Sequence, residues 1–131
     1  MISSHEAIRL AKAGQISSQE LLKLLVEGKV DVPASDLPEI EDGVITGWKP
    51  ATLAKADGSQ WLVAFTAREL ASAFMDRDPD YGFYVNVDMR WVLLRALPPD
   101  HGIVFNVGSP EQLEWNAAGL AKYKKDVLGW E

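Results

Sequence analysis

The hydrophobic pattern begins with two short helical segments joined by a tight turn. Ser3 or Ser4 is placed to cap the first helix, and Gly14 follows its expected end, where a left-handed residue is favoured. Ser17 and Glu20 have the spacing of a capping box, and a leucine-rich stretch follows them. Because only a few residues separate the two segments, the pattern predicts an N-terminal helical hairpin.

Alternating apolar positions then predict short strands. One covers residues 30–32, ahead of a proline, and two more cover residues 51–55 and 60–66 on either side of Asp57 and Gly58. An Asp-Gly pair supplies the positive φ that a tight hairpin turn requires. The sequence therefore predicts a β-hairpin over residues 51–66.

The second arm of this hairpin is apolar on both faces. One face carries Trp61, Val63 and Phe65, and the other carries Leu62 and Ala64. A strand that is apolar on both faces is typical of the centre of a sheet that is covered on both sides. We expect this strand to lie at the middle of the core.

Helices and strands alternate in the rest of the chain. Thr66 and Glu69 repeat the capping-box spacing and predict a helix that runs to about Met75. The elements expected after it are a strand at residues 83–87, a short helix begun by Asp88 and ended by Pro98 and Pro99, a strand at residues 103–107, a brief strand at residues 113–115 and a last helix capped by Asn116.

Together these elements predict one α+β domain over residues 1–131. We expect a mixed, mostly antiparallel sheet of about five strands flanked by helices, with the helical hairpin at the N-terminus. The β-α-β-α-β portion leaves room for parallel neighbours in that sheet. The chain has no internal repeat, and no linker long enough to separate two domains.

Charge and composition narrow the class of protein. Lys plus Arg number 13 and Asp plus Glu number 19, so the net charge is −6, which argues against a nucleic-acid-binding protein. The absence of cysteine excludes disulfides, thiolate metal sites and cysteine nucleophiles. No signal-peptide pattern and no run of about 18 apolar residues occur, so we expect a cytoplasmic protein that does not bind membranes.

An acidic segment is the strongest candidate for a binding site. Residues 34–47 carry Asp36, Glu39, Glu41 and Asp42 with no basic residue, and Trp48 follows directly. The pattern predicts a solvated loop with a brief strand near residues 44 and 45. Carboxylates would steer a basic partner toward this loop, and a tryptophan would anchor it. The hypothesis is a protein-binding surface formed by these five residues.

A small-ligand or metal-binding module is the alternative. Carboxylates in the turn from Asp76 to Gly82 resemble the start of a calcium loop, but Tyr81 stands where that loop needs glycine and Val87 where it needs glutamate. The pattern therefore favours an acidic surface turn. The turn at residues 106–109 is the other candidate, because its backbone N–H groups could hold an anion.

Catalytic chemistry has little support in the sequence. His5 and His101 lie far apart, each without a partner at metal-ligand spacing, and we expect both to be solvated. No phosphate-binding loop and no nucleophile elbow occurs. We expect no enzyme activity, no catalytic residue and no cofactor.

Three stretches of the chain resemble the N-terminal domain of the SseB-like family. They are the pair of helices carrying Ser17, Glu20, Leu21 and Leu22 that runs into Val30-Asp31-Val32-Pro33; Asp57-Gly58-Ser59 with Trp61-Leu62-Val63-Ala64-Phe65-Thr66 and the following Glu69-Leu70; and Leu97-Pro98-Pro99 with Gly102-Ile103-Val104-Phe105-Asn106-Val107-Gly108-Ser109. Val107 replaces the proline that the family has in its Asn-Pro-Gly turn.

The resemblance implies an α+β bacterial domain from a family named for a serine-sensitivity phenotype. It supplies no catalytic residue. Because some members accompany secretion or toxin systems, it implies protein binding, with an immunity- or chaperone-like role in a toxin or effector system.

Overall fold

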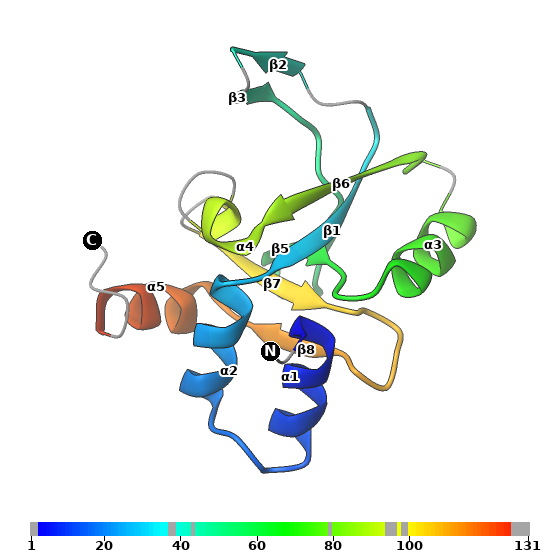
Figure 1. The fold of residues 1–131 in the computed structure, drawn as a ribbon. Helices are drawn as coiled ribbons and strands as arrows, with labels where there is room; N and C mark the ends of the chain where they lie inside the picture. The colour runs from blue at the N-terminus through cyan, green and yellow to red at the C-terminus, as the bar shows by residue number, and fades with distance from the viewer. Residues whose placement is uncertain are drawn as a thin grey trace.

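The computed structural model describes residues 3–36, 39–42, 44–78, 80–93, 97 and 100–126 (Figure 1). The helices are α1 (Ser4–Lys12), α2 (Ser18–Val26), α3 (Arg68–Arg77), α4 (Met89–Trp91) and α5 (Ala117–Asp126). The strands are β1 (Lys29–Ala34), β2 (Glu39–Glu41), β3 (Val44–Gly47), β4 (Thr52–Ala54), β5 (Gln60–Ala64), β6 (Phe83–Asp88), β7 (His101–Phe105) and β8 (Leu113–Trp115).

The helices and strands confirm the α+β class and the N-terminal helical hairpin. The strands divide into small sheets. The largest has the order β4-β5-β7-β8, in which β5 and β7 are parallel and the other pairs antiparallel. β1 pairs with β6, and β2 with β3, both antiparallel. Two backbone hydrogen bonds of 2.9 Å between Asp31 and Phe65 join the middle of β1 to the residue that follows β5.

β5 is the central strand that its pattern predicts. Leu62 and Ala64 belong to the main core cluster, which α1, α2, α4, α5 and the inner faces of β1 and β7 complete. Trp61, Val63 and Phe65 belong to a second cluster on the opposite face, where α3 supplies Ala71. Figure 1 shows α1 and α2 below the strands, α5 at their left-hand end and α3 at their right-hand end. The strand is thus buried on both faces.

Close packing over Gly102 fixes the pairing of β5 with β7. Gly102 lies opposite Trp61, and a Cβ atom on it would stand 2.6 Å from the Trp61 ring and 2.6 Å from the Trp115 carbonyl oxygen. Only glycine leaves room for both groups. The indole therefore lies directly against the backbone of the neighbouring strand.

The helix caps confirm some predicted residues and correct others. The Ser3, Ser17 and Asn116 side chains accept hydrogen bonds from backbone N–H groups at the starts of α1, α2 and α5. The predicted capping box at Thr66 is wrong: α3 begins one residue later, after Ala67, and no side chain caps it. Asp88 precedes α4 but also makes no capping hydrogen bond.

Thr66 instead belongs to a buried network built around Asn106. The Asn106 amide nitrogen donates to Thr66 Oγ1 at 2.9 Å and to the Glu111 carbonyl oxygen at 3.3 Å. Its amide oxygen accepts from the Thr66 backbone N–H at 2.9 Å. Asn106 is fully buried and has a φ of 55°, in the left-handed region. It ties the end of β5 to the turn after β7.

The predicted acidic loop contains a hairpin. β2 and β3 pair within residues 39–47, so strand structure extends beyond the brief strand that the sequence predicts. All three β2 residues are exposed, and two of them are glutamates. The sequence therefore suggests a solvated loop here. Of the tryptophans, Trp130 lies outside the described residues.

A second polar contact joins Lys55, the residue after β4, to Glu114 of β8. Lys55 Nζ donates to Glu114 Oε1 and lies 3.9 Å from the centroid of the Trp61 ring. The hydrogen bond from Lys55, above all, lowers the pKa of Glu114 below its ordinary value of 4.5. Both side chains are about one-third exposed, so the contact is screened by solvent.

Replacing Asn106 tests the network. Asn106→Ala removes three hydrogen bonds and leaves the Thr66 N–H without its partner, which should cost about 2–4 kcal/mol in the free energy of unfolding. Asn106→Gly loses the same bonds but relieves the left-handed backbone, so it should be more stable than the alanine variant by about 1 kcal/mol. Urea unfolding of the two variants measures both differences; an alanine variant as stable as wild type contradicts the assignment.

The Lys55–Glu114 contact predicts a pH dependence. Because the folded-state pKa of Glu114 is lowered, the ionised carboxylate stabilises the fold above the ordinary value of 4.5, and this stabilisation disappears as the pH falls through the folded-state value. Glu114→Gln should therefore cost less than about 1 kcal/mol at neutral pH, and a smaller amount at an acidic pH below the ordinary value of 4.5. Urea unfolding at both pH values measures the change; an equal difference at both excludes the ionic contribution.

Candidate functional site

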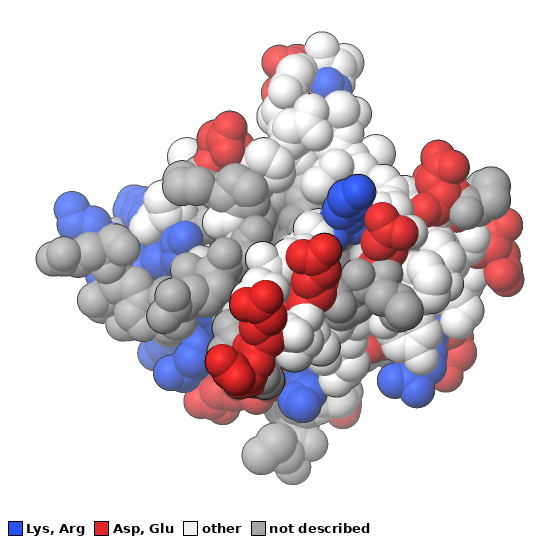
Figure 2. Space-filling view, turned by 90° about the horizontal axis from the view of Figure 1, so that it is seen from above, with Lys and Arg blue, Asp and Glu red and all other residues white. Residues whose placement is uncertain are grey.

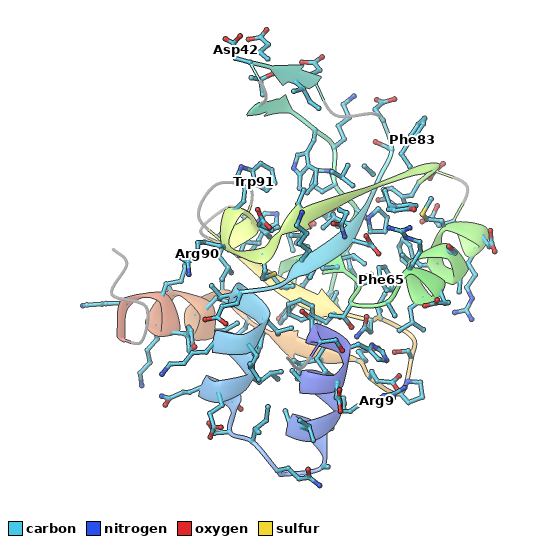
Figure 3. The ribbon with its side chains drawn as sticks, in the orientation of Figure 1. Arg9, Asp42, Phe65, Phe83, Arg90 and Trp91 are labelled. Carbon is cyan, nitrogen blue, oxygen red and sulfur yellow. The ribbon has the colours of Figure 1, made fainter. Side chains whose placement is uncertain are left out.

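The β2–β3 hairpin stands away from the rest of the fold (Figure 1). Its strands pair antiparallel, and Asp42 lies at the turn with a positive φ of 52°. Asp42 marks the far end of the hairpin in Figure 3. Ile40, in the middle of β2, is 60% exposed. The hairpin thus presents both carboxylates and an apolar side chain to solvent.

A pocket of about 540 Å³ lies at the base of this hairpin. Four segments of the chain meet there: the residues after β1, the start of β2, the end of β3 and the start of β6. The residues that line it are Asp36, Glu39, Gly47, Trp48, Lys49 and Phe83. We call it the hairpin-base pocket.

Trp48 is held in the wall of the hairpin-base pocket by the core. Its ring meets the Trp91 ring of α4 edge to face, with centroids 5.4 Å apart, and both rings pack against the main core cluster. The residue is half-buried. Trp48 is therefore a fixed aromatic surface in the pocket, and its ring does not stand free in solvent.

Phe83 is a pocket residue that the sequence pattern does not reveal. It alternates with Val85 and Val87, and Val87 is buried while Val85 packs partly against the core. Phe83 is the first residue of β6, where it pairs with Ala34, and is 40% exposed. Figure 3 shows it near the base of the hairpin. Phe83 is exposed because it lies at the end of the strand. The alternation of apolar residues does not predict this exposure.

The two carboxylates of the hairpin-base pocket have different surroundings. Asp36 Oδ2 lies 3.5 Å from Lys49 Nζ, and their side chains are 67% and 74% exposed. Glu39 pairs with Gly47 across the hairpin, and its Oε2 would stand 2.9 Å from a Cβ atom at Gly47. The carboxylate of Glu39 therefore folds back over the glycine, toward the pocket.

The structure brings together three of the five predicted site residues. Asp36, Glu39 and Trp48 line the hairpin-base pocket, whereas Glu41 and Asp42 lie toward the turn of the hairpin. All four acidic residues are exposed. Figure 2, seen from the hairpin side, shows acidic side chains gathered over this part of the molecule.

The turn from Asp76 to Gly82 and the turn at residues 106–109, the candidates for a small-ligand or metal site, make hydrogen bonds within the chain. Asp76 belongs to the last turn of α3, and Asp78 accepts a hydrogen bond from the Asp80 N–H at 3.1 Å. In the part of the chain that the structure describes, no three His, Asp or Glu side chains are grouped to hold a metal ion. In the other turn, the Gly108 and Ser109 N–H groups donate to Gln112 and Asn106, so they are not directed at a ligand.

His5 is not solvated, in contrast to the sequence expectation. Its Nδ1 lies 2.9 Å from Thr66 Oγ1 and its Nε2 lies 3.9 Å from Glu111 Oε1. The side chain is 20% exposed. Because Thr66 and Glu111 are distant in the sequence, spacing could not reveal this contact. His101 begins β7 and its Nδ1 lies 3.0 Å from Asp100 Oδ1.

Comparison with known proteins shows the family of this chain. No curated protein and no solved structure matches the chain significantly. No helix within the described ranges has the length and apolar character needed to cross a membrane. The family described as SseB protein N-terminal domain matches residues 5–122, which is most of the chain. The chain therefore belongs to the SseB N-terminal domain family.

Proposed function

We propose that this domain is a non-enzymatic cytoplasmic protein that binds a partner with a basic surface through the β2–β3 hairpin and the hairpin-base pocket. The observation that carries the proposal is that the pocket joins Asp36 and Glu39 to the aromatic rings of Trp48 and Phe83. Carboxylates and exposed aromatic side chains in one concave surface are typical of a site for a basic protein.

The hairpin carboxylates support the first step of binding. Asp36, Glu39, Glu41 and Asp42 are exposed on a projecting segment, in a chain of net charge −6. Such an arrangement attracts a positively charged partner before contact and raises the association rate, an effect that salt screens over about 10 Å. Only Lys49 forms an ion pair with any of these four in the described residues.

Apolar side chains support the second step. Ile40 and Phe83, 60% and 40% exposed, flank the carboxylates on β2 and at the start of β6. Burying them against a partner removes apolar surface from water, which stabilises a complex independently of salt. Trp48, already fixed by Trp91, adds contact area with little further loss of side-chain entropy.

The family suggests the setting. The resemblance to SseB-like domains favours a bacterial protein with an immunity- or chaperone-like role in a toxin or effector system. A role of this kind means binding a toxin or effector protein, so it requires a protein-binding surface. The hairpin and its pocket are the surface that we assign to it.

Neutralising the hairpin tests the proposed steering. Asp36→Asn, Glu39→Gln, Glu41→Gln and Asp42→Asn together should slow association with the partner by about tenfold or more at low salt, because the attracting charges are lost. The partner is first captured from lysate at low salt, with a parallel capture at about 0.5 M salt, and identified by mass spectrometry. Stopped-flow association rates of the purified pair are then measured against salt concentration.

A control variant has the same change in net charge. Glu69→Gln, Asp76→Asn, Asp80→Asn and Asp88→Asn alter four exposed carboxylates away from the hairpin. The control should keep most of the wild-type rate and its salt dependence. Equal slowing by both variants means that net charge alone is responsible, and an unchanged rate in the hairpin variant rejects the proposal.

Phe83 and Leu53 give a matched test of the apolar contact. They are 40% and 39% exposed, but only Phe83 lines the hairpin-base pocket. Phe83→Ala should weaken partner binding by about tenfold, because a central aromatic anchor is lost, whereas Leu53→Ala should change it by less than about twofold. Isothermal titration calorimetry measures both affinities; similar losses would remove Phe83 from the interface.

A further inference from the structure

The hairpin-base pocket has the chemistry of a receptor for one cationic side chain. It combines two carboxylates with two aromatic rings, contributed by separate segments of the chain. Carboxylates pair with a cation, and aromatic faces attract the same cation through their π electrons. A volume of about 540 Å³ also exceeds what a single long side chain needs. Electrostatic attraction of a partner by the hairpin carboxylates would need neither the aromatic rings nor a pocket of this size.

Lys49 already places a cation at one side of the pocket. Its Nζ lies 3.5 Å from Asp36 Oδ2, and both side chains are mostly exposed. An exposed ion pair of this kind contributes little stability, so a competing cation can displace it. The Glu39 carboxylate, which folds over Gly47 on another side of the pocket, has no ion pair in the described residues.

We propose that the hairpin-base pocket binds the guanidinium group of a single arginine side chain of the partner, which takes the place of the Lys49 ammonium at Asp36. The inference rests on the proposed protein-binding function and specifies what the site recognises. Arginine fits better than lysine because its planar group has five N–H donors for two carboxylates and stacks on aromatic rings. Lys49 then acts as an internal competitor.

Gly47 makes the site sensitive to a single methyl group. A Cβ atom at this position would approach Glu39 Oε2 to 2.9 Å, so the carboxylate would have to move. The far end of a glutamate side chain moves at little cost to the fold. Gly47→Ala therefore displaces one ligand of the proposed arginine without changing any charge.

The test uses a short capped Gly/Ser peptide with one central arginine, titrated into the full ¹⁵N-labelled chain. We expect saturable shifts of the Trp48 indole N–H signal, with a dissociation constant on the order of millimolar. The same peptide with citrulline, which has the shape of arginine but no charge, should give no saturable shift. The lysine peptide should bind more weakly than the arginine peptide.

Variants separate the pocket from general charge effects. Gly47→Ala and Glu39→Gln should each weaken arginine-peptide binding by about two- to fivefold. Lys49→Gln should strengthen binding by about twofold, whereas Lys23→Gln, which changes the same charge on exposed α2 surface, should not. Backbone amide spectra of each variant show whether the fold is retained.

The outcomes distinguish this inference from the proposed function. No shift at Trp48, equal binding of the citrulline peptide, or wild-type affinity in both Gly47→Ala and Glu39→Gln overturns the arginine site. If partner association still depends on the hairpin carboxylates, the protein-binding function stands without it. If arginine binds but the hairpin variant associates with its partner at the wild-type rate, the proposed steering fails instead.

Discussion

The burial of β5 on both faces is the constraint on which the rest of the structure depends. A strand with large apolar side chains on each side needs a covering layer on each side and a paired strand at each edge. The chain provides β4 and β7 at the edges, α3 over one face, and α1, α2 and α5 over the other. Because β7 runs parallel to β5, a crossover must connect them, and α3, β6 and α4 form it.

This crossover explains how the hairpin-base pocket forms. It places β6 beside β1, so Phe83 comes to lie opposite Ala34, next to the residues that lead into the hairpin. The two arms of the hairpin are tied together below it by a hydrogen bond from the Ser35 N–H to the Lys49 carbonyl oxygen, of 3.1 Å. Contacts with the core therefore hold the pocket walls in place. The β2 residues are exposed, so acidic side chains there bury no charge.

Local sequence signals predict much of this fold. Ser3, Ser17 and Asn116 cap the helices that their spacing predicts, and the two apolar faces of β5 are visible in the sequence. What depends on contacts between distant residues is not predictable in this way. Thr66 has the spacing of a helix cap, but its hydroxyl bonds to Asn106 and His5, which lie 40 and 61 residues away.

The candidate site is also predicted only in part, because some of its residues depend on contacts between distant parts of the chain. The acidic composition of residues 36–42 and the neighbouring Trp48 identify half of the hairpin-base pocket from sequence alone. Phe83 is missed because its alternation with Val85 and Val87 is typical of a core position. The role of Gly47 is missed because it depends on the cross-strand carboxylate of Glu39.

Hydrogen–deuterium exchange of the domain, free and bound to its captured partner, tests the central claim most directly. The account predicts that the partner slows exchange in residues 36–49 and at the start of β6, and leaves α1, α2 and α5 unchanged. Protection confined to the helices, with none at the hairpin or at Phe83, would contradict it.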